Sequence, residues 1–241
     1  MNLIAKAVMA AAALATISPA PALADPRIGS RIDRSDRGLT GRFNPRRAES
    51  VRPAINAYFR CKASLDRARA QSVLDLEYMS DEQKEMIDEV GPPSMFARDE
   101  REDCFSMLGG GGVQIGADAQ SAVGAFAEYF VTRQYDAEDA ARLATLTRED
   151  WQIPAMTPRN GNEMIGLCTA QAAGSQVFRL LETEPASDGE GPAIQEVVPY
   201  LAPCLTDGLE VSFDASSLRA MLAHSLYKAL SGQEALEKAA S

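Results

Sequence analysis

The sequence of 241 residues has one histidine, one tryptophan and only 6% aromatic residues. A single histidine excludes sites that need several imidazoles, such as the H-E-x-x-H zinc site. None of the four cysteines forms a C-x-x-C pair, so the usual dithiol redox centre is excluded as well. Neither G-x-G-x-x-G nor G-x-x-x-x-G-K-[ST] occurs, which excludes these nucleotide-binding loops. We therefore expect no cofactor and no resident metal.

Long apolar runs are lacking after the first two dozen residues, so no transmembrane span is expected. The N-terminus has Lys6, an apolar stretch over residues 7–17 and a small-x-small site that ends at Ala24. This pattern is typical of a signal peptide, and we assign it to residues 1–24, with cleavage before Asp25. The expected location is periplasmic or secreted.

Basic residues are fewer than acidic ones, and the formal charge of −10 argues against binding to nucleic acid. The charge is uneven, because eight arginines, four acids and no lysine lie between Asp25 and Pro53. Residues 25–50 also have few aliphatic side chains, which predicts a disordered arginine-rich arm. Three roles stay open for this arm: contact with the acidic body of its own chain, contact with an anionic surface, or a spacer without a partner.

Two stretches of the sequence repeat each other. Cys61-Lys62-Ala63 recurs as Cys168-Thr169-Ala170, and the offset of 107 positions holds as far as Ser80-Asp81 and Ser187-Asp188. The repeat resumes at Asp118 and Asp214 with an offset of 96. We interpret this as one structural unit used twice. The predicted organisation is repeat unit 1 at 51–135, a linker with a helix at 136–160, repeat unit 2 at 161–232 and a C-terminal tail at 233–241.

Four cysteines in an exported protein indicate two disulfides. A unit that once existed alone would pair its own cysteines, so we favour Cys61 with Cys104 and Cys168 with Cys204. The alternative of a catalytic thiol has no supporting motif. Each bridge is expected to stabilise the fold by about 4 kcal/mol.

The hydrophobic pattern within each unit is mainly helical. Apolar residues recur at three-and-four spacing over 53–76 and 163–183, with a break expected after each cysteine. Ser80 and Gln83 form a capping box for a helix that ends before Gly91. Asp118 and Asp214 are predicted N-caps of helices over 119–133 and 215–230. Further helices are expected over 136–146 and, in unit 2, from about Pro192 with a disturbance at Pro199.

Two short runs with alternating polarity, Val113–Ile115 and Leu209–Phe213, predict brief strands. They could pair with each other across a pseudo-twofold axis. The predicted fold class is therefore mainly α, with two tandem disulfide-stapled helical units related by a pseudo-twofold and a short two-stranded β element.

Ser225 and Lys228 match S-x-x-K, the nucleophile motif of serine β-lactamases. The motif falls late in a predicted helix, and the companion motifs S-D-N and K-T-G are missing, so we interpret the match as chance. His224, the lone histidine, is interpreted as a polar helix position equivalent to Glu128. The tract Gly109–Gly112 could cradle phosphate, but a loop insertion is the simpler interpretation.

Acidic clusters at 99–103 and at Glu149-Asp150 lack the spacing of a calcium loop and are interpreted as solvated ends. Trp151 is expected to pack the linker onto the core. We predict no catalytic residue, and the expected function is a non-catalytic binding or protein-interaction module of the cell envelope. Its partner, a protein or a small molecule, stays open, and the alternative is a periplasmic hydrolase that uses Ser225 and Lys228.

Overall fold

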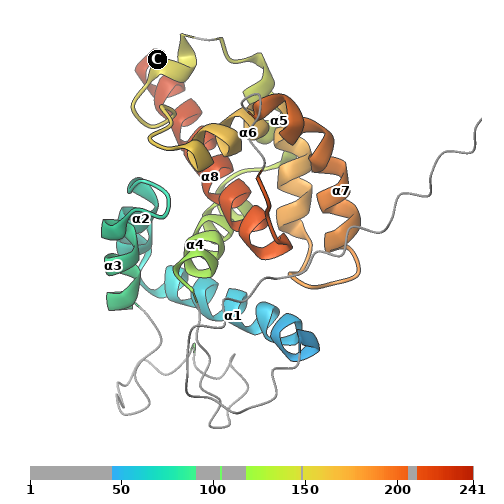
Figure 1. The fold of residues 1–241 in the computed structure, drawn as a ribbon. Coiled ribbons are helices and arrows are strands. Elements are labelled where there is room, and N and C mark those ends of the chain that lie inside the picture. Colours follow the sequence, from blue (N-terminus) through green and yellow to red (C-terminus); the bar gives the residue numbers. More distant parts are fainter. Residues whose placement is uncertain (1–44, 91–103, 105–117, 148, 206–210, 241) are drawn as a thin grey trace, which may run out of the picture.

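The computed structural model describes residues 45–90, 104, 118–147, 149–205 and 211–240. Within these ranges the chain forms eight α-helices and short 3₁₀ turns, which confirms the mainly helical fold (Figure 1). None of these helices is long and apolar enough to cross a membrane. The helices are α1 (Pro45–Leu65), α2 (Arg67–Asp75), α3 (Asp81–Val90), α4 (Ala119–Gln134), α5 (Ala137–Arg142), α6 (Gly161–Glu182), α7 (Glu190–Leu201) and α8 (Ala215–Ala240).

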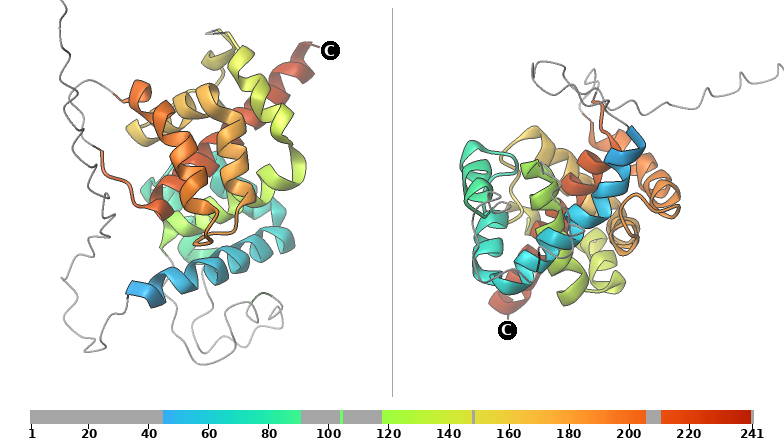
Figure 2. Two further views of the ribbon diagram at one scale, coloured as in Figure 1. Left: turned by 90° about the vertical axis from the view of Figure 1, so that its right-hand side faces the viewer. Right: turned by 90° about the horizontal axis from the view of Figure 1, so that it is seen from below.

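Helices α4 and α8 pack against each other at the centre of the molecule. Helix α1 lies across α4, and α6 packs along α8 (Figures 1 and 2). Helices α2 and α3 contact α4 on one side, while α5 and α7 flank α6 on the other. One cluster of buried side chains contains residues of both halves, such as Phe59, Phe126, Leu181 and Leu222. Residues of 51–135 and of 161–232 therefore share a single core.

The predicted N-caps of the two central helices are confirmed. The carboxylate of Asp118 accepts the N–H of Ser121 at 2.6 Å, and that of Asp214 accepts the N–H of Ser217 at 2.8 Å. Each bond satisfies a backbone donor that has no partner within the helix. The helix expected in the linker is α5, where Asp136 and Asp139 form a full capping box.

The helical segments predicted over 53–76 and 163–183 are both interrupted. Asp66 leaves the helical conformation (φ −133°) between α1 and α2, and its carboxylate accepts the N–H of Arg69. Helix α6 continues through a kink at Ala173 (φ −141°). The turns that follow contain one left-handed residue each, Met79 and Ala186, both with φ 59°.

The capping box predicted at Ser80 is only half formed. Ser80 Oγ accepts the N–H of Gln83 at 3.1 Å, as expected. Gln83 Oε1 instead accepts the N–H of Met79 at 2.7 Å, because the N–H of Ser80 is already bonded to the carbonyl of Glu77. Helix α3 ends at Val90, where the following Gly-Pro-Pro predicted its end.

The predicted strand at Leu209–Phe213 is wrong for its described part, residues 211–213, which form no strand. Val211 and Phe213 pack against the core and Ser212 between them is exposed, so the alternation marks which side chains cover the core. Its expected partner, 113–115, lies outside the described residues. The two-stranded element is not formed among the described residues.

The helix predicted over 215–230 is longer than expected, because α8 continues to Ala240 and so includes residues 233–240 of the predicted C-terminal tail. Pairs one turn apart stabilise this end, Gln233 with Glu237 and Glu234 with Lys238. At the other end α1 begins at Pro45, so residues 45–50 of the predicted arm are helical, and proline suits a first helical turn. The signal peptide and the rest of the arm lie outside the described residues.

The two disulfides join Cys61 to Cys104 and Cys168 to Cys204, the pairing that the repeat favours. They close loops of 43 and 36 positions. No free cysteine remains. In the second repeat the bridge ties α6 to the 3₁₀ turn Ala202–Cys204 that follows α7.

Close packing between α4 and α8 depends on Gly124. A Cβ added there would lie 2.7 Å from Ala220 Cβ. We expect Gly124→Ala to force the helices apart and to lower the free energy of unfolding by about 1–3 kcal/mol. Urea unfolding measures this change.

Gly191→Ala is the matched control, since an added Cβ there meets nothing within 4 Å. This exposed position of α7 should be neutral or slightly stabilising. Equal effects of the two substitutions would contradict the packing argument.

Candidate functional site

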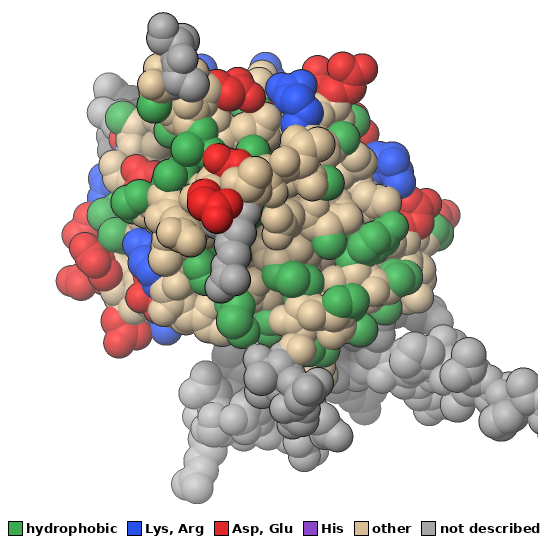
Figure 3. All heavy atoms as spheres, turned by 90° about the horizontal axis from the view of Figure 1, so that it is seen from above, with side chains coloured by type: hydrophobic (Ala, Val, Ile, Leu, Met, Phe, Trp, Pro, Cys, Tyr) green, Lys and Arg blue, Asp and Glu red, His purple; other side chains and the backbone are tan. Residues whose placement is uncertain are grey.

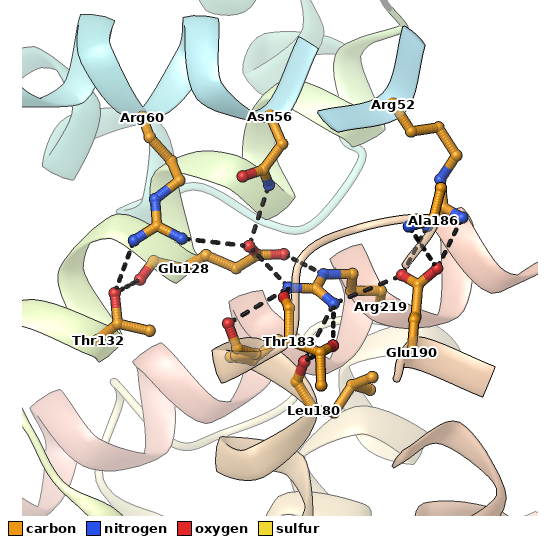
Figure 4. A network of polar contacts seen from close by, with 11 residues as sticks. Arg52, Asn56, Arg60, Glu128, Thr132, Leu180, Thr183, Ala186, Glu190 and Arg219 are labelled. Atoms are coloured by element: carbon orange, nitrogen blue, oxygen red, sulfur yellow. Dashed lines mark hydrogen bonds and ion pairs between the residues drawn. The ribbon is translucent and has the colours of Figure 1, made fainter. Parts of the chain in front are cut away.

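An extensive polar network among the described residues is centred on Arg219 of α8, which is 3% exposed (Figure 4). Its guanidinium binds Glu128 of α4 through two bonds, from Nε at 2.6 Å and from Nη2 at 3.1 Å. Nη1 lies 3.4 Å from Glu190 of α7. The same group donates to the carbonyls of Leu180 and Thr183 at the end of α6. One side chain thus connects four helices.

Helix α1 supplies the other side of this network. Both Nη atoms of Arg52 lie 2.8 Å from the two carboxylate oxygens of Glu190. Asn56 donates to Glu128 at 3.0 Å, and Arg60 donates to Thr132 Oγ1 at 3.0 Å (Figure 4). Burial, opposed by Glu128, lowers the pKa of Arg60. All of these charged groups have partners inside the network.

A cavity of about 40 Å³ lies beside the network, between Arg52, Glu128, Pro185 and Arg219. It has room for a water molecule. Binding sites for organic ligands are about ten times larger. The network therefore has the features of a structural ion cluster rather than of a substrate site.

A second buried network surrounds Glu163 at the start of α6. Its carboxylate accepts the backbone N–H groups of Tyr78 at 2.9 Å and Arg159 at 2.7 Å, and Lys228 Nζ lies 3.1 Å away. Burial alone would raise the pKa of Glu163, but these hydrogen bonds and the ammonium of Lys228 lower it to about 2. The pair of Glu163 and Lys228 is thus an internal ion pair.

His224 is fully buried next to this pair. Its Nε2 lies 3.0 Å from the carbonyl oxygen of Leu74, and its ring lies 5.1 Å from that of Tyr78. Because a carbonyl only accepts, Nε2 carries the proton, and Nδ1 has no partner among the described residues. Burial, aided by the charge of Lys228, lowers the pKa of His224 to about 3. No histidine surface is visible among the described side chains in Figure 3.

Ser225 is 1% exposed and faces Gly166 of α6, where its hydroxyl leaves no room for a Cβ. Lys228, the second residue of the S-x-x-K match, is bonded to Glu163. An acyl-transfer site needs a nucleophile that substrate can reach. The geometry therefore gives no support to this pair as a catalytic site.

The remaining predicted positions divide into two groups. The tract Gly109–Gly112 and the acids at 99–103 lie outside the described residues. Asp150 accepts bonds from the backbone N–H and the hydroxyl of Thr147, which is a local turn contact. Trp151 packs against the core, as expected for a residue that anchors the linker.

Sequence reasoning missed Arg219 and Glu190 and took Glu128 for an ordinary polar position. A usable signal is present, because Glu128 stands within the apolar stretch 122–131 and Arg219 is followed closely by Met221 and Leu222. A lone charge at a core position of a helix indicates a buried partner. The identity of that partner depends on the tertiary fold.

Removal of one partner from the Arg219 network should be costly. We expect Glu128→Gln to lower the free energy of unfolding by about 3–5 kcal/mol, because the buried guanidinium of Arg219 loses the negative charge of its main partner. Glu196→Gln is the matched control, since its pair with Arg179 is exposed and should contribute about 0–1 kcal/mol. Urea unfolding of both variants measures the difference, and similar small losses would contradict a buried ion pair.

The lone histidine makes stability depend on pH. The folded chain keeps His224 neutral down to a pKa of about 3, whereas the unfolded chain binds the proton near pH 6.5. Stability should therefore fall as pH drops below about 6.5, with a slope of up to about 1.4 kcal/mol per pH unit. In the His224→Gln variant the free energy of unfolding, measured with urea, should change little between pH 7 and pH 5. This interval lies roughly above the pH at which most carboxyl groups titrate. Parallel profiles for the two proteins would contradict the assignment.

Comparison of the chain with protein-family models, curated proteins and solved structures finds no match. In the part of the chain that the structure describes, no group of three His, Cys, Asp or Glu side chains could hold a metal ion. The candidate site consists of two buried polar networks whose charged groups bind each other.

Proposed function

We propose that the chain is an exported protein of the cell envelope that acts as a non-catalytic binding or protein-interaction module. One observation carries the proposal: Ser225 and Lys228, the two residues of the S-x-x-K match, are buried together with Glu163 and His224, and Lys228 and His224 are bonded within the core. General acid–base chemistry requires such groups within reach of a substrate. These side chains hold helices together, so we infer that the protein binds its partner through surface residues.

The module is proposed to consist of two tandem copies of one unit. The left-handed residues Met79 and Ala186 are 107 positions apart, the offset that also separates Cys61 from Cys168. The helix breaks at Asp66 and Ala173 have the same separation. Backbone irregularities at matching positions are a strong signal, because they are independent of side-chain identity.

A pseudo-twofold relation between the copies has support at the central crossing. Gly124 and Ala220 are equivalent by the second offset of 96 positions, and they contact each other. A residue that touches its own equivalent lies next to a twofold axis. Gln83 and Glu190 are also equivalent, and each accepts the N–H of the left-handed residue four positions before it.

Export is supported by the two disulfides, which form and persist in oxidising compartments. The signal peptide stays a prediction from the sequence. Arg52 of α1, just after the predicted arm of residues 25–50, is bound to Glu190 of the same chain. The three roles that the sequence leaves open for the arm itself stay open.

Native mass spectrometry of the protein, purified under mild conditions from the envelope of its host, tests the proposal. We expect a mature chain that starts at Asp25 and lacks four hydrogens because of the two disulfides. A population with one discrete additional mass at fixed stoichiometry is also expected. A chain that still starts at Met1, or the bare mass alone under every mild condition, would count against it.

The alternative hydrolase makes the opposite prediction for covalent probes. Incubation with a fluorophosphonate or a β-lactam would then add the probe to Ser225, and Ser225→Ala would abolish the adduct. Intact-mass measurement of both proteins detects it. Such an adduct would overturn the non-catalytic proposal whatever the native spectra contain.

A further inference from the structure

Helices α2 and α3 form a hairpin at the edge of the molecule (Figures 1 and 2). Both helices lie inside the loop that the disulfide between Cys61 and Cys104 closes. At the start of the hairpin, Asp66 leaves the helical conformation (φ −133°) and separates α2 from α1. A non-helical residue at the end of an element can serve as a hinge. The hairpin is therefore a unit that can move while both ends of its loop stay tied together.

Polar bonds fasten the turn between α2 and α3 to the rest of the protein. Asn160, just before α6, donates from Nδ2 to the carboxylate of Glu77 and to the carbonyl oxygen of Tyr78, each at 2.9 Å. Gln120 of α4 donates to Tyr78 Oη at 2.9 Å. The turn also contains Met79, whose φ of 59° is costly for a residue other than glycine. Such a conformation persists because the surrounding contacts hold it in place.

His224 fastens the hairpin to α8. Its Nε2 donates to the carbonyl oxygen of Leu74 at 3.0 Å, and its ring lies 5.1 Å from that of Tyr78. The side chain is fully buried, and Nδ1 has no partner among the described residues. Release of the hairpin removes the cover that α2 and the following turn place over the ring. The imidazole is then accessible to water.

The surroundings of His224 are balanced in charge while the ring is neutral. The titratable and charged groups that act on this region are two cations, two carboxylates and one phenol: Lys228 on α8, Arg159 and Glu163 at the start of α6, and Asp75 and Tyr78 on the hairpin. Burial raises the pKa of the Tyr78 phenol, which stays neutral, and the amide that α4 contributes to this turn is neutral as well. A proton on Nδ1 would add an unbalanced positive charge near Lys228 and a buried N–H without an acceptor. The closed hairpin therefore excludes an imidazolium, and a released hairpin accepts one.

We propose that the α2–α3 hairpin is an acid-sensitive latch, which protonation of His224 releases from α8 while the other helices stay packed. The Arg219 network contains no residue of the hairpin, so it continues to hold α1, α4, α6, α7 and α8 together after release (Figure 4). This device is additional to the proposed binding function and does not depend on it. Release uncovers the surface of α8 around His224, so pH controls access to that surface.

The direction of the pH dependence follows from the two states of the imidazole. Exposed imidazole binds a proton at its ordinary pKa of about 6.5, whereas burial lowers the pKa of His224 in the closed form to about 3. The closed form is therefore favoured above about pH 6.5. Below it the released population rises by up to about tenfold per pH unit.

Hydrogen exchange of backbone amides in the folded, disulfide-bonded protein tests the proposal between about pH 7 and pH 5, with and without low concentrations of urea. After correction for the intrinsic exchange rate at each pH, we expect amides of α2 and α3 to lose protection by up to about tenfold per pH unit. They should be less protected than amides of α4 and α8 and should depend weakly on urea, because a partial opening exposes little surface. Protection of α2 and α3 that is constant with pH would overturn the latch. Protection equal to that of α4 and α8 at every pH would mean global unfolding alone and would overturn it too.

His224→Gln removes the titrating group and keeps an N–H donor for the carbonyl oxygen of Leu74, so it should abolish the pH dependence of exchange in α2 and α3. Tyr78→Phe is the matched control, since it removes the bond from Gln120 and keeps the ring. It should raise exchange of the hairpin severalfold at every pH and leave the slope against pH unchanged. A slope that persists in His224→Gln, or that is lost in Tyr78→Phe, would overturn the role of His224. If His224→Gln does not fold, Tyr78→Phe and the comparison of helices within the unsubstituted protein still decide the question.

Discussion

The buried guanidinium of Arg219 is the group on which the arrangement of the helices depends. It binds Glu128 of α4, approaches Glu190 of α7 and donates to carbonyls at the end of α6. A buried charge without such partners would carry a desolvation cost of several kcal/mol. The close contact between α4 and α8 at Gly124 brings Arg219 within reach of Glu128. Packing and electrostatics therefore require the same separation of these two helices.

The proposed duplication gives the two buried networks a common origin. Glu128 and His224 are equivalent positions on α4 and α8. Through Arg219, Glu128 is linked to the end of α6, whereas His224 binds the carbonyl of Leu74 in α2 directly. Each central helix thus contacts the N-terminal helical segment of the other repeat. One junction uses an ion pair and the other a neutral imidazole, so positions that the proposed duplication makes equivalent carry different chemistry.

Much of the fold follows from local sequence signals, because helix caps and helix ends depend on neighbouring residues. Asp118 and Asp214 are examples, and the disulfide pairing followed from the repeat. The polar networks could not be predicted, since Arg219 and Glu128 are 91 positions apart. The strand predicted at Leu209–Phe213 is not formed over its described part, residues 211–213, because alternation also arises where every second side chain of an irregular segment covers a core. The helical end of α8 was missed because its polar composition resembles that of a tail.

A double-mutant cycle between Glu128 and Arg219 tests most directly whether this ion pair organises the fold. Glu128→Gln, Arg219→Met and the combined variant are compared by urea unfolding. If the ion pair organises the fold, the two positions are strongly coupled, and the double variant is roughly 1.5–3 kcal/mol more stable than the sum of the single losses implies. Additive losses would contradict it, because they would mean that the two side chains stabilise the protein independently.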